Sequence, residues 1–158
     1  MRSLGRNFSI LIFLAGLLVP WSGSMAQHGH GHGTGAKMET RTVVVEGVKV
    51  IFGIMENEEH RKMLKEMKRK EEVEAGTTHN ISVTLREAKT DKEISDATIQ
   101  MKVIDPKGKD QIKTLKYAAE MKSYDAYFNL KEKGRYQVLL LFRIGEKKGT
   151  AGIYYEVK

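Results

Sequence analysis

The chain has 158 residues, of which 27 are basic and 20 acidic, so its formal net charge is +7 at pH 7. Basic and acidic residues are interleaved along most of the sequence, whereas a nucleic-acid-binding protein concentrates its cations on one face or arm. Cysteine is absent, which excludes disulfides and thiolate metal sites and leaves histidine and methionine as ligands for soft metals. The length suits one domain with a tail.

The first part of the chain has the pattern of an export signal. Arg2 and Arg6 precede an apolar stretch, and Ser24 and Ala26 are the small residues at −3 and −1 of a cleavage site, which predicts a signal peptide over residues 1 to 26. The alternative is an uncleaved membrane anchor, but the apolar stretch is shorter than the roughly 20 residues that a bilayer crossing needs. We therefore expect a periplasmic or secreted protein with no membrane span after cleavage.

A segment rich in glycine and histidine follows, from residue 27 to 40. It carries almost no apolar side chain, so it is predicted to be a disordered tail. Its alternating histidines, His28, His30 and His32, can chelate Cu(II), Ni(II) or Zn(II) from a flexible backbone. The alternative is a chance cluster in a glycine-rich linker.

Residues 41 to 158 are predicted to form one domain. Valine-rich stretches on both sides of Gly47 indicate a hairpin or two short strands. A helix is predicted from about residue 57 to 71, with Asn57 as the N-cap, acidic residues in its first turn and basic residues in its last. Its apolar stripe is narrow, so we expect a surface helix that contributes little to the core.

After Gly76 a period of two dominates, which predicts strands. The alternating sets are His79, Ile81, Val83 and Leu85; Ala97, Ile99, Met101 and Val103; Tyr124, Ala126, Phe128 and Leu130; Tyr136, Val138, Leu140 and Phe142; and Ala151, Ile153, Tyr155 and Val157. A weak strand is predicted from Gln111 to Tyr117, and the strand that starts at Tyr136 is apolar on both faces, which predicts a central position. Short strands with a single helix predict an all-β, Ig-like antiparallel β-sandwich with one inserted surface helix.

The spacing of Leu130, Gly134 and Tyr136 is the most specific structural motif. It resembles the tyrosine corner of Ig-like sandwiches, in which a tyrosine hydroxyl bonds back to the backbone of the preceding loop. The alternative is an ordinary inward-facing aromatic residue.

Residues 78 to 158 carry a set of short motifs. They are His79 at the start of a strand, Thr90-Asp91 with Ile94 and Asp96-Ala97 before the next strand, Met121 before Tyr124-x-x-Tyr127-x-x-Leu130, and Gly134-x-Tyr136. In these motifs the region resembles the YtkA-like and FixH-like periplasmic domains. The resemblance implies an Ig-like sandwich of a kind often found near copper proteins, and it implies ligand roles for His79 and Met121. Met101 could join them, but its inward position in mid-strand favours a place in the core.

A second group of candidate ligands belongs to the predicted helix. His60, Met63 and Met67 are spaced i, i+3 and i+7 and therefore share one helix face, with Met55 just before the helix. Thioethers are soft ligands that suit Cu(I) or Ag(I). The alternative is that Met63 and Met67 pack as adaptable apolar fillers.

No enzyme motif is present: we find no glycine-rich phosphate loop, no His-Glu-x-x-His and no paired carboxylates that stand out from the charged surface. We therefore expect a non-enzymatic metal-binding or carrier domain for copper or another soft or borderline metal. The alternative is a periplasmic adaptor or scaffold that binds another exported protein without a metal. An exported protein or metalloprotein is the expected partner, and nucleic acid is not.

Overall fold

The computed structural model describes residues 37 to 158; the predicted signal peptide and the histidines His28, His30 and His32 lie outside the described residues. The described elements are, in chain order, β1 (Met38–Val45), β2 (Val48–Glu56), α1 (Asn57–Glu66), β3 (His79–Glu87), β4 (Thr98–Ile104), β5 (Asp110–Thr114), β6 (Lys116–Ala118), β7 (Ser123–Phe128), β8 (Gly134–Ile144) and β9 (Lys147–Val157). Over this range of the chain, the helix is too short and too polar to cross a bilayer.

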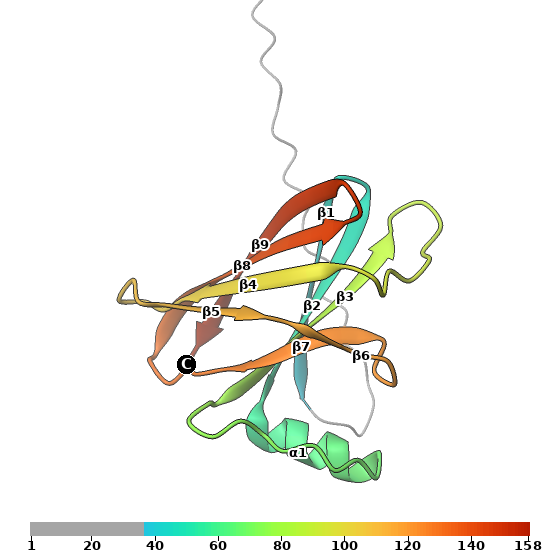
Figure 1. The fold of residues 1–158 in the computed structure, drawn as a ribbon. Coiled ribbons are helices and arrows are strands. Elements are labelled where there is room, and N and C mark those ends of the chain that lie inside the picture. Colours follow the sequence, from blue (N-terminus) through green and yellow to red (C-terminus); the bar gives the residue numbers. More distant parts are fainter. Residues whose placement is uncertain (1–36) are drawn as a thin grey trace, which may run out of the picture.

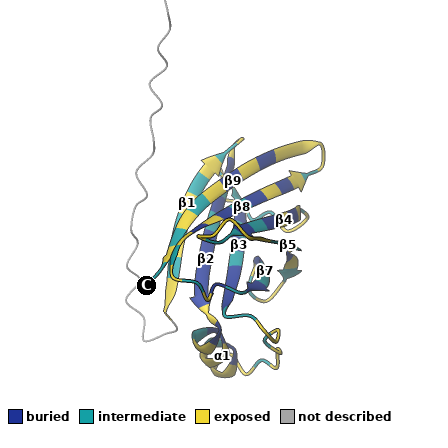
Figure 2. Cartoon of the chain, turned by 90° about the vertical axis from the view of Figure 1, so that its left-hand side faces the viewer, coloured by how far each residue is buried: buried dark blue, intermediate teal, exposed yellow. Residues whose placement is uncertain are grey.

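The strands form two antiparallel sheets that pack face to face (Figure 1). The five-stranded sheet has the order β1-β2-β3-β7-β6, and the four-stranded sheet has the order β5-β4-β8-β9. Helix α1 connects β2 to β3 and lies at one end of the five-stranded sheet in both views (Figures 1 and 2). The predicted all-β, Ig-like antiparallel sandwich with one inserted helix is confirmed.

The core lies between the sheets and is built from alternate residues of each strand, so buried and exposed positions alternate along the strands (Figure 2). The largest fully buried side chains are Phe52, Ile81, Leu85, Ile99, Met101, Tyr124, Phe128, Leu130, Tyr136, Leu140 and Phe142. Most of these positions follow the period of two in the sequence. Met101 is completely buried among them, which confirms its place in the core.

Strand β8 lies between β4 and β9, which confirms its predicted interior position. Only one of its faces is buried, however. Leu141 on the other face is 48% exposed, and Tyr154 on the neighbouring β9 and Ile112 on β5 are also exposed. The apolar run in β8 therefore fits a strand that has a neighbour on each side in the sheet. It does not mean that both faces of the strand are buried.

Strand β1 begins at Met38, so the predicted tail boundary at residue 40 was wrong. Met38 lies opposite Met55 of β2, and the two strands stay in register to the turn at Gly47. Glu46 and Gly47 both have positive φ, as a two-residue hairpin turn requires, which confirms the predicted hairpin. The β1 pairing is a long-range interaction that the polar sequence at its start does not signal.

Helix α1 ends at Glu66 and not near residue 71, because a backbone cap closes it. Lys68 has φ of 56°, and the amides of Lys68 and Arg69 donate to the carbonyls of Lys65 and Leu64 at 3.0 and 2.8 Å. This bond pair is a Schellman motif, which stops a helix.

The predicted N-cap of α1 was also wrong. Glu56 takes this position with an extended backbone and makes no side-chain cap bond. Asn57 is already helical, and its side-chain amide donates to the Thr77 hydroxyl at 2.9 Å. The side chain of Asn57 therefore ties the helix to the segment that leads into β3.

The predicted strand from Gln111 to Tyr117 is two strands in different sheets. β5 pairs with β4 and β6 pairs with β7, and the chain changes sheet at Leu115. Leu115 is buried, and its amide donates to the Ile99 carbonyl at 3.0 Å. The break explains why this stretch gave only a weak pattern.

The predicted tyrosine corner is present. The Tyr136 hydroxyl donates to the Glu132 carbonyl and accepts from the Glu132 amide, both at 2.9 Å. Gly134 has φ of 121°, and a side chain there would approach Pro106 within 3.0 Å. The corner thus needs a glycine two residues before the tyrosine.

Candidate metal site

Helix α1 lies over one row of residues on the outer face of the five-stranded sheet. Across the sheet the row is Met38 on β1, Met55 on β2, Asn80 on β3 and Tyr127 on β7, each opposite the next. The sequence neighbours Ile54, Ile81 and Phe128 belong to the core, so the row faces away from it. The helix contacts β2 and β3, and its His60 ring lies 5.5 Å from the Tyr127 ring.

His60 is oriented by a relay of hydrogen bonds. The Tyr127 hydroxyl is 3.0 Å from His60 Nδ1 and 3.2 Å from Glu71 Oε1. A carboxylate only accepts, so the single hydroxyl proton goes to Glu71 and the Tyr127 oxygen accepts from His60 Nδ1–H. The neutral ring then carries its lone pair on Nε2, whereas the hydrogen bond to Tyr127 is made by Nδ1.

The surroundings keep His60 neutral. His60 is 3% exposed, and burial lowers its pKa, an effect that Glu71 and Asp125 oppose only in part. Burial likewise raises the pKa of Tyr127, so the hydroxyl keeps its proton. A neutral imidazole with a free lone pair is the form that binds a metal.

A second polar pair lies beside this relay on the same face. Asn80 donates a hydrogen bond from Nδ2 to Asp125 Oδ2 at 2.8 Å. Burial raises the pKa of Asp125, with a further contribution from Glu71, and the bond from Asn80 opposes the shift. The relay and this pair thus provide hydrogen-bond partners for His60, Tyr127, Asn80 and Asp125.

The predicted methionine ligands of the helix differ in exposure. Met55 is 5% exposed and Met63 is half-buried, whereas Met67 is 44% exposed at the C-cap of α1. Met55 and Met63 are therefore shielded from solvent to different degrees, and Met67 extends toward solvent.

The structure places His79 on the opposite face of the sheet from His60. His79 lies opposite Phe128 and shares the inward face of Ile81. Its Nδ1 is 2.8 Å from the Thr78 hydroxyl, and its Nε2 is 3.5 Å from the Tyr155 hydroxyl. Burial lowers the pKa of His79, with Glu56 opposing the shift. Both ring nitrogens of His79 thus face protein hydroxyls, Nδ1 closely and Nε2 at a longer distance.

His79 and Met121 are not brought together. Met121 precedes β7, and His79 lies opposite the far end of β7 at Phe128. The residues from Tyr124 to Phe128 alone span about 13 Å. Met101, in the core of the other sheet, does not bridge this separation.

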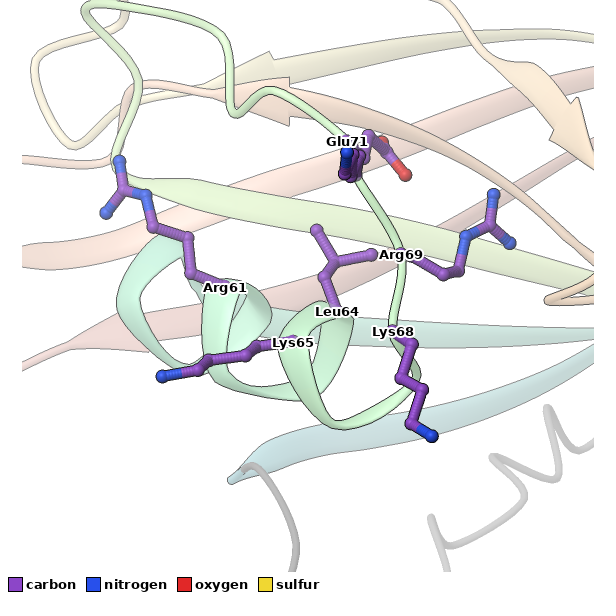
Figure 3. Close-up of a pocket in the computed structure, with 7 residues that line it drawn as sticks. Arg61, Leu64, Lys65, Lys68, Arg69 and Glu71 are labelled. Carbon is purple, nitrogen blue, oxygen red and sulfur yellow. The ribbon is translucent and has the colours of Figure 1, made fainter.

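Two surface hollows lie near the helix. One, of about 310 Å³, is lined by five cations, Leu64 and Glu71. Figure 3 shows that Arg61 and Lys65 extend to one side while Lys68 and Arg69 extend to the other, so their charged ends diverge and do not surround an anion. The other, of about 700 Å³, is a groove between residues 69 to 74 and strands β6 and β7.

Between residues 37 and 158, no three histidine or carboxylate side chains are arranged to hold a metal ion. Helix spacing in the sequence indicates His60 and Met63, but no pattern in the sequence marks Glu71 and Tyr127 as partners of His60. Tyr127 was part of a recognised motif, but its contact with the helix depends on strand pairing, which leaves no local signal.

No family model and no curated protein matches the chain. Its fold is similar to that of FetP from uropathogenic Escherichia coli strain F11, with a TM-score of 0.57 and 11% identity over 78% of this chain and 97% of FetP. A copper-bound variant of FetP matches with the same score. A DUF4426 family protein of Pseudomonas aeruginosa PAO1 gives a TM-score of 0.56 and 14% identity over 75% of this chain and 94% of that protein. At these identities the similarity concerns the fold.

Proposed function

We propose that this protein is an exported, non-enzymatic metal-binding or carrier domain, with copper as its metal. One observation carries the proposal: the relay from Glu71 through Tyr127 fixes the His60 ring and leaves Nε2 with a free lone pair. Metal-binding histidines typically donate their other ring N–H to a fixed acceptor, which sets the tautomer and orientation. The similarity in fold to FetP, of which a copper-bound structure exists, supports the choice of metal.

The neighbouring residues support a soft or borderline metal. Met63 follows His60 by about one helical turn, Met55 precedes the helix on β2, and the chain has no cysteine. Copper in either oxidation state accepts imidazole, and Cu(I) also accepts thioether sulfur. The histidines of the tail would act as an auxiliary binding segment that raises the local concentration of metal.

The test compares two buried histidines. His60→Gln should abolish copper binding by the domain, whereas His79→Gln should leave it unchanged, because the nitrogens of His79 already face hydroxyl groups. Both substitutions are made in a chain in which His28, His30 and His32 are replaced by alanine, so that the tail does not contribute. Binding is measured by competition with a chromophoric Cu(I) chelator, and circular dichroism confirms that each variant is folded.

Two results would contradict the proposal. One is a folded chain that takes no copper from the chelator. The other is equal binding by the His60→Gln variant and its parent.

A second candidate function is an adaptor that docks on another exported protein. The exposed apolar side chains Ile112, Leu141 and Tyr154 on the outer face of the four-stranded sheet favour it. If this face binds a partner, the Leu141→Lys variant should lose a protein that co-purifies with the parent chain from a periplasmic extract. Co-purification that is unchanged would count against this face.

A further inference from the structure

The outer face of the four-stranded sheet carries an exposed apolar strip. Ile112 on β5, Leu141 on β8 and Tyr154 on β9 are 55%, 48% and 52% exposed, and they are half of the large apolar side chains that are exposed in the described part of the chain. The half-buried Leu139 lies in the same row of the sheet as Ile112, with Lys102 of β4 between them. Leu139 and Leu141 alternate with core residues of β8, so the strip faces away from the core.

The strip is flat at its centre because Gly152 of β9 has no side chain. Gly152 lies opposite Leu139, and a Cβ atom there would be 2.9 Å from Leu139 Cδ2. The Leu139 side chain therefore lies over the backbone of β9. Helix α1 packs against β2 and β3 of the other sheet and leaves this face open.

Two cations stand directly opposite each other at one end of the strip. Arg143 on β8 pairs in register with Lys148 on β9, in the row that follows Leu141 and Thr150. Both side chains are exposed, and neither makes an ion pair with another described residue. Like charges directly opposite each other destabilise a sheet, so an anion bound at this end would relieve their repulsion.

The other charges on the outward positions of these strands do not balance this pair. The Lys102 ammonium is 2.8 Å from Asp110 Oδ2, so these two charges neutralise each other. At the far end of the strip Arg135 lies opposite Glu156, and its guanidinium is 3.7 Å from the centroid of the Tyr154 ring. With Arg143 and Lys148, the face therefore has four cations and two carboxylates, and its excess of positive charge lies at one end.

This distribution of charge favours an acidic protein over the other possible occupants of the face. In a symmetric dimer the same patch meets itself, so a second copy of this chain would bring together two faces with excess positive charge. Gln100, Gln137 and Thr150 interrupt the strip, whereas a membrane-bound face buries a continuous apolar surface among the lipids. Tyrosine and arginine around an apolar centre are typical of protein interfaces.

We propose that the outer face of the four-stranded sheet docks an acidic amphipathic segment of another exported protein. Apolar side chains of the segment would pack on Ile112, Leu139, Leu141 and Tyr154, and its carboxylates would pair with Arg143 and Lys148. This inference deepens the second candidate function. It does not depend on copper, because the helix that carries His60 packs on the other sheet.

The test uses a synthetic amphipathic peptide with a stripe of leucines and glutamate at its remaining positions, and a control peptide with lysine in place of each glutamate. The methyl resonances of Ile112, Leu139 and Leu141 are followed by NMR in the full chain. The glutamate peptide should shift these resonances, and the lysine peptide should not.

A charge reversal makes the test specific. The Arg143→Glu and Lys148→Glu double variant should bind the glutamate peptide more than about tenfold more weakly than the parent, and it should bind the lysine peptide more tightly. The Arg61→Glu and Lys65→Glu double variant is the matched control, because it makes the same change in charge at two exposed positions of α1. This control should bind both peptides as the parent does.

Several results would overturn the proposal. Equal binding of the two peptides by the parent would show that charge does not select the partner. Binding to phosphatidylglycerol vesicles that the Arg143→Glu and Lys148→Glu variant loses, by a chain that ignores the glutamate peptide, would assign the face to a lipid surface. A dimer in sedimentation that the Leu141→Lys variant loses would assign it to a second copy of the chain.

The outcomes also separate this inference from the functions proposed above. If the chain ignores the glutamate peptide but a co-purifying protein is lost from the Leu141→Lys variant, the adaptor function stands and the acidic partner is wrong. If the chain binds the peptide as expected but takes no copper, the docking face stands and the metal-binding function fails.

Discussion

At the scale of single residues, the contrast between His60 and His79 shows that burial alone does not define a ligand. Both side chains are under 10% exposed, and burial lowers the pKa of both. What differs is the number of hydrogen-bonding partners: His79 has one hydroxyl for each ring nitrogen, whereas His60 has one hydroxyl and one free nitrogen. The chemistry of the ring is set by these partners and not by its depth.

The relay that orients His60 gives the first prediction. Tyr127→Phe removes the acceptor for His60 Nδ1–H, so the ring loses its fixed tautomer, and copper affinity should fall by about 10- to 100-fold. The nitrogen-15 shifts of the imidazole should change from one tautomer to a mixture. Tyr124→Phe is a matched control because it removes another buried hydroxyl, which contacts Ala97 and Ile94 far from the helix. Equal loss of affinity in both variants would show only a general effect on the fold.

The tyrosine corner gives the second prediction. Tyr136→Phe deletes a hydroxyl that satisfies both the amide and the carbonyl of Glu132, and it leaves these backbone groups without partners. Loss of a buried hydrogen-bond partner costs about 1–3 kcal/mol, so the free energy of unfolding in urea should fall by that amount. An unchanged urea midpoint would mean that water replaces the hydroxyl at no cost.

At the scale of elements, the end of α1 carries a strained residue. Lys68 adopts φ of 56° to make the Schellman cap, a backbone conformation that glycine adopts without penalty. Lys68→Gly should therefore raise the free energy of unfolding by about 1 kcal/mol. Lys65→Gly, inside the same helix and also exposed, is the control and should lower it by about 1 kcal/mol. The prediction fails if both substitutions destabilise the protein.

The sequence predicted those elements whose signal is local. Alternation identified β3, β4, β7 and β8, because their inward residues meet a continuous core. The helix was predicted, but not its end, since a lysine takes the position where glycine is the usual signal. The sheet change at Leu115 was not predicted, because it depends on pairing with strands distant in sequence.

In the candidate site, too, the sequence predicts only what depends on residues close together in the chain. His60, Met55 and Met63 were predicted from helix spacing and proximity along the chain. Met38 was assigned to the tail, because only its register opposite Met55 places it on the sheet. Alternation already placed His79 on the face of Ile81, but its two hydroxyl partners come from tertiary packing.

At the scale of the whole molecule, buried titratable groups make stability depend on pH. The pKa values of His60 and His79 lie below their ordinary value of 6.5, so below that pH the unfolded chain binds more protons than the folded one. Their contribution to stability is complete above about pH 6.5 and is lost as the pH falls. Asp125 acts in the opposite sense, because its raised pKa lets the folded chain bind a proton above the ordinary value of 3.8.

In a metal-free chain, the urea midpoint should therefore decrease from about pH 7.5 to about pH 5.5. His79→Gln should reduce this decrease, since one of the two neutral rings is removed while His60 keeps its contacts with Tyr127 and Glu71. Asp125→Asn should make it steeper, because the negative charge of Asp125 raises the pKa of His60, and an asparagine at this position can still bond with Asn80. Saturating Cu(I) should raise the parent midpoint across this range without flattening the curve, since a metal on Nε2 binds the folded state and keeps its His60 unprotonated. A midpoint independent of pH in the metal-free parent would show that both rings accept protons without leaving their sites.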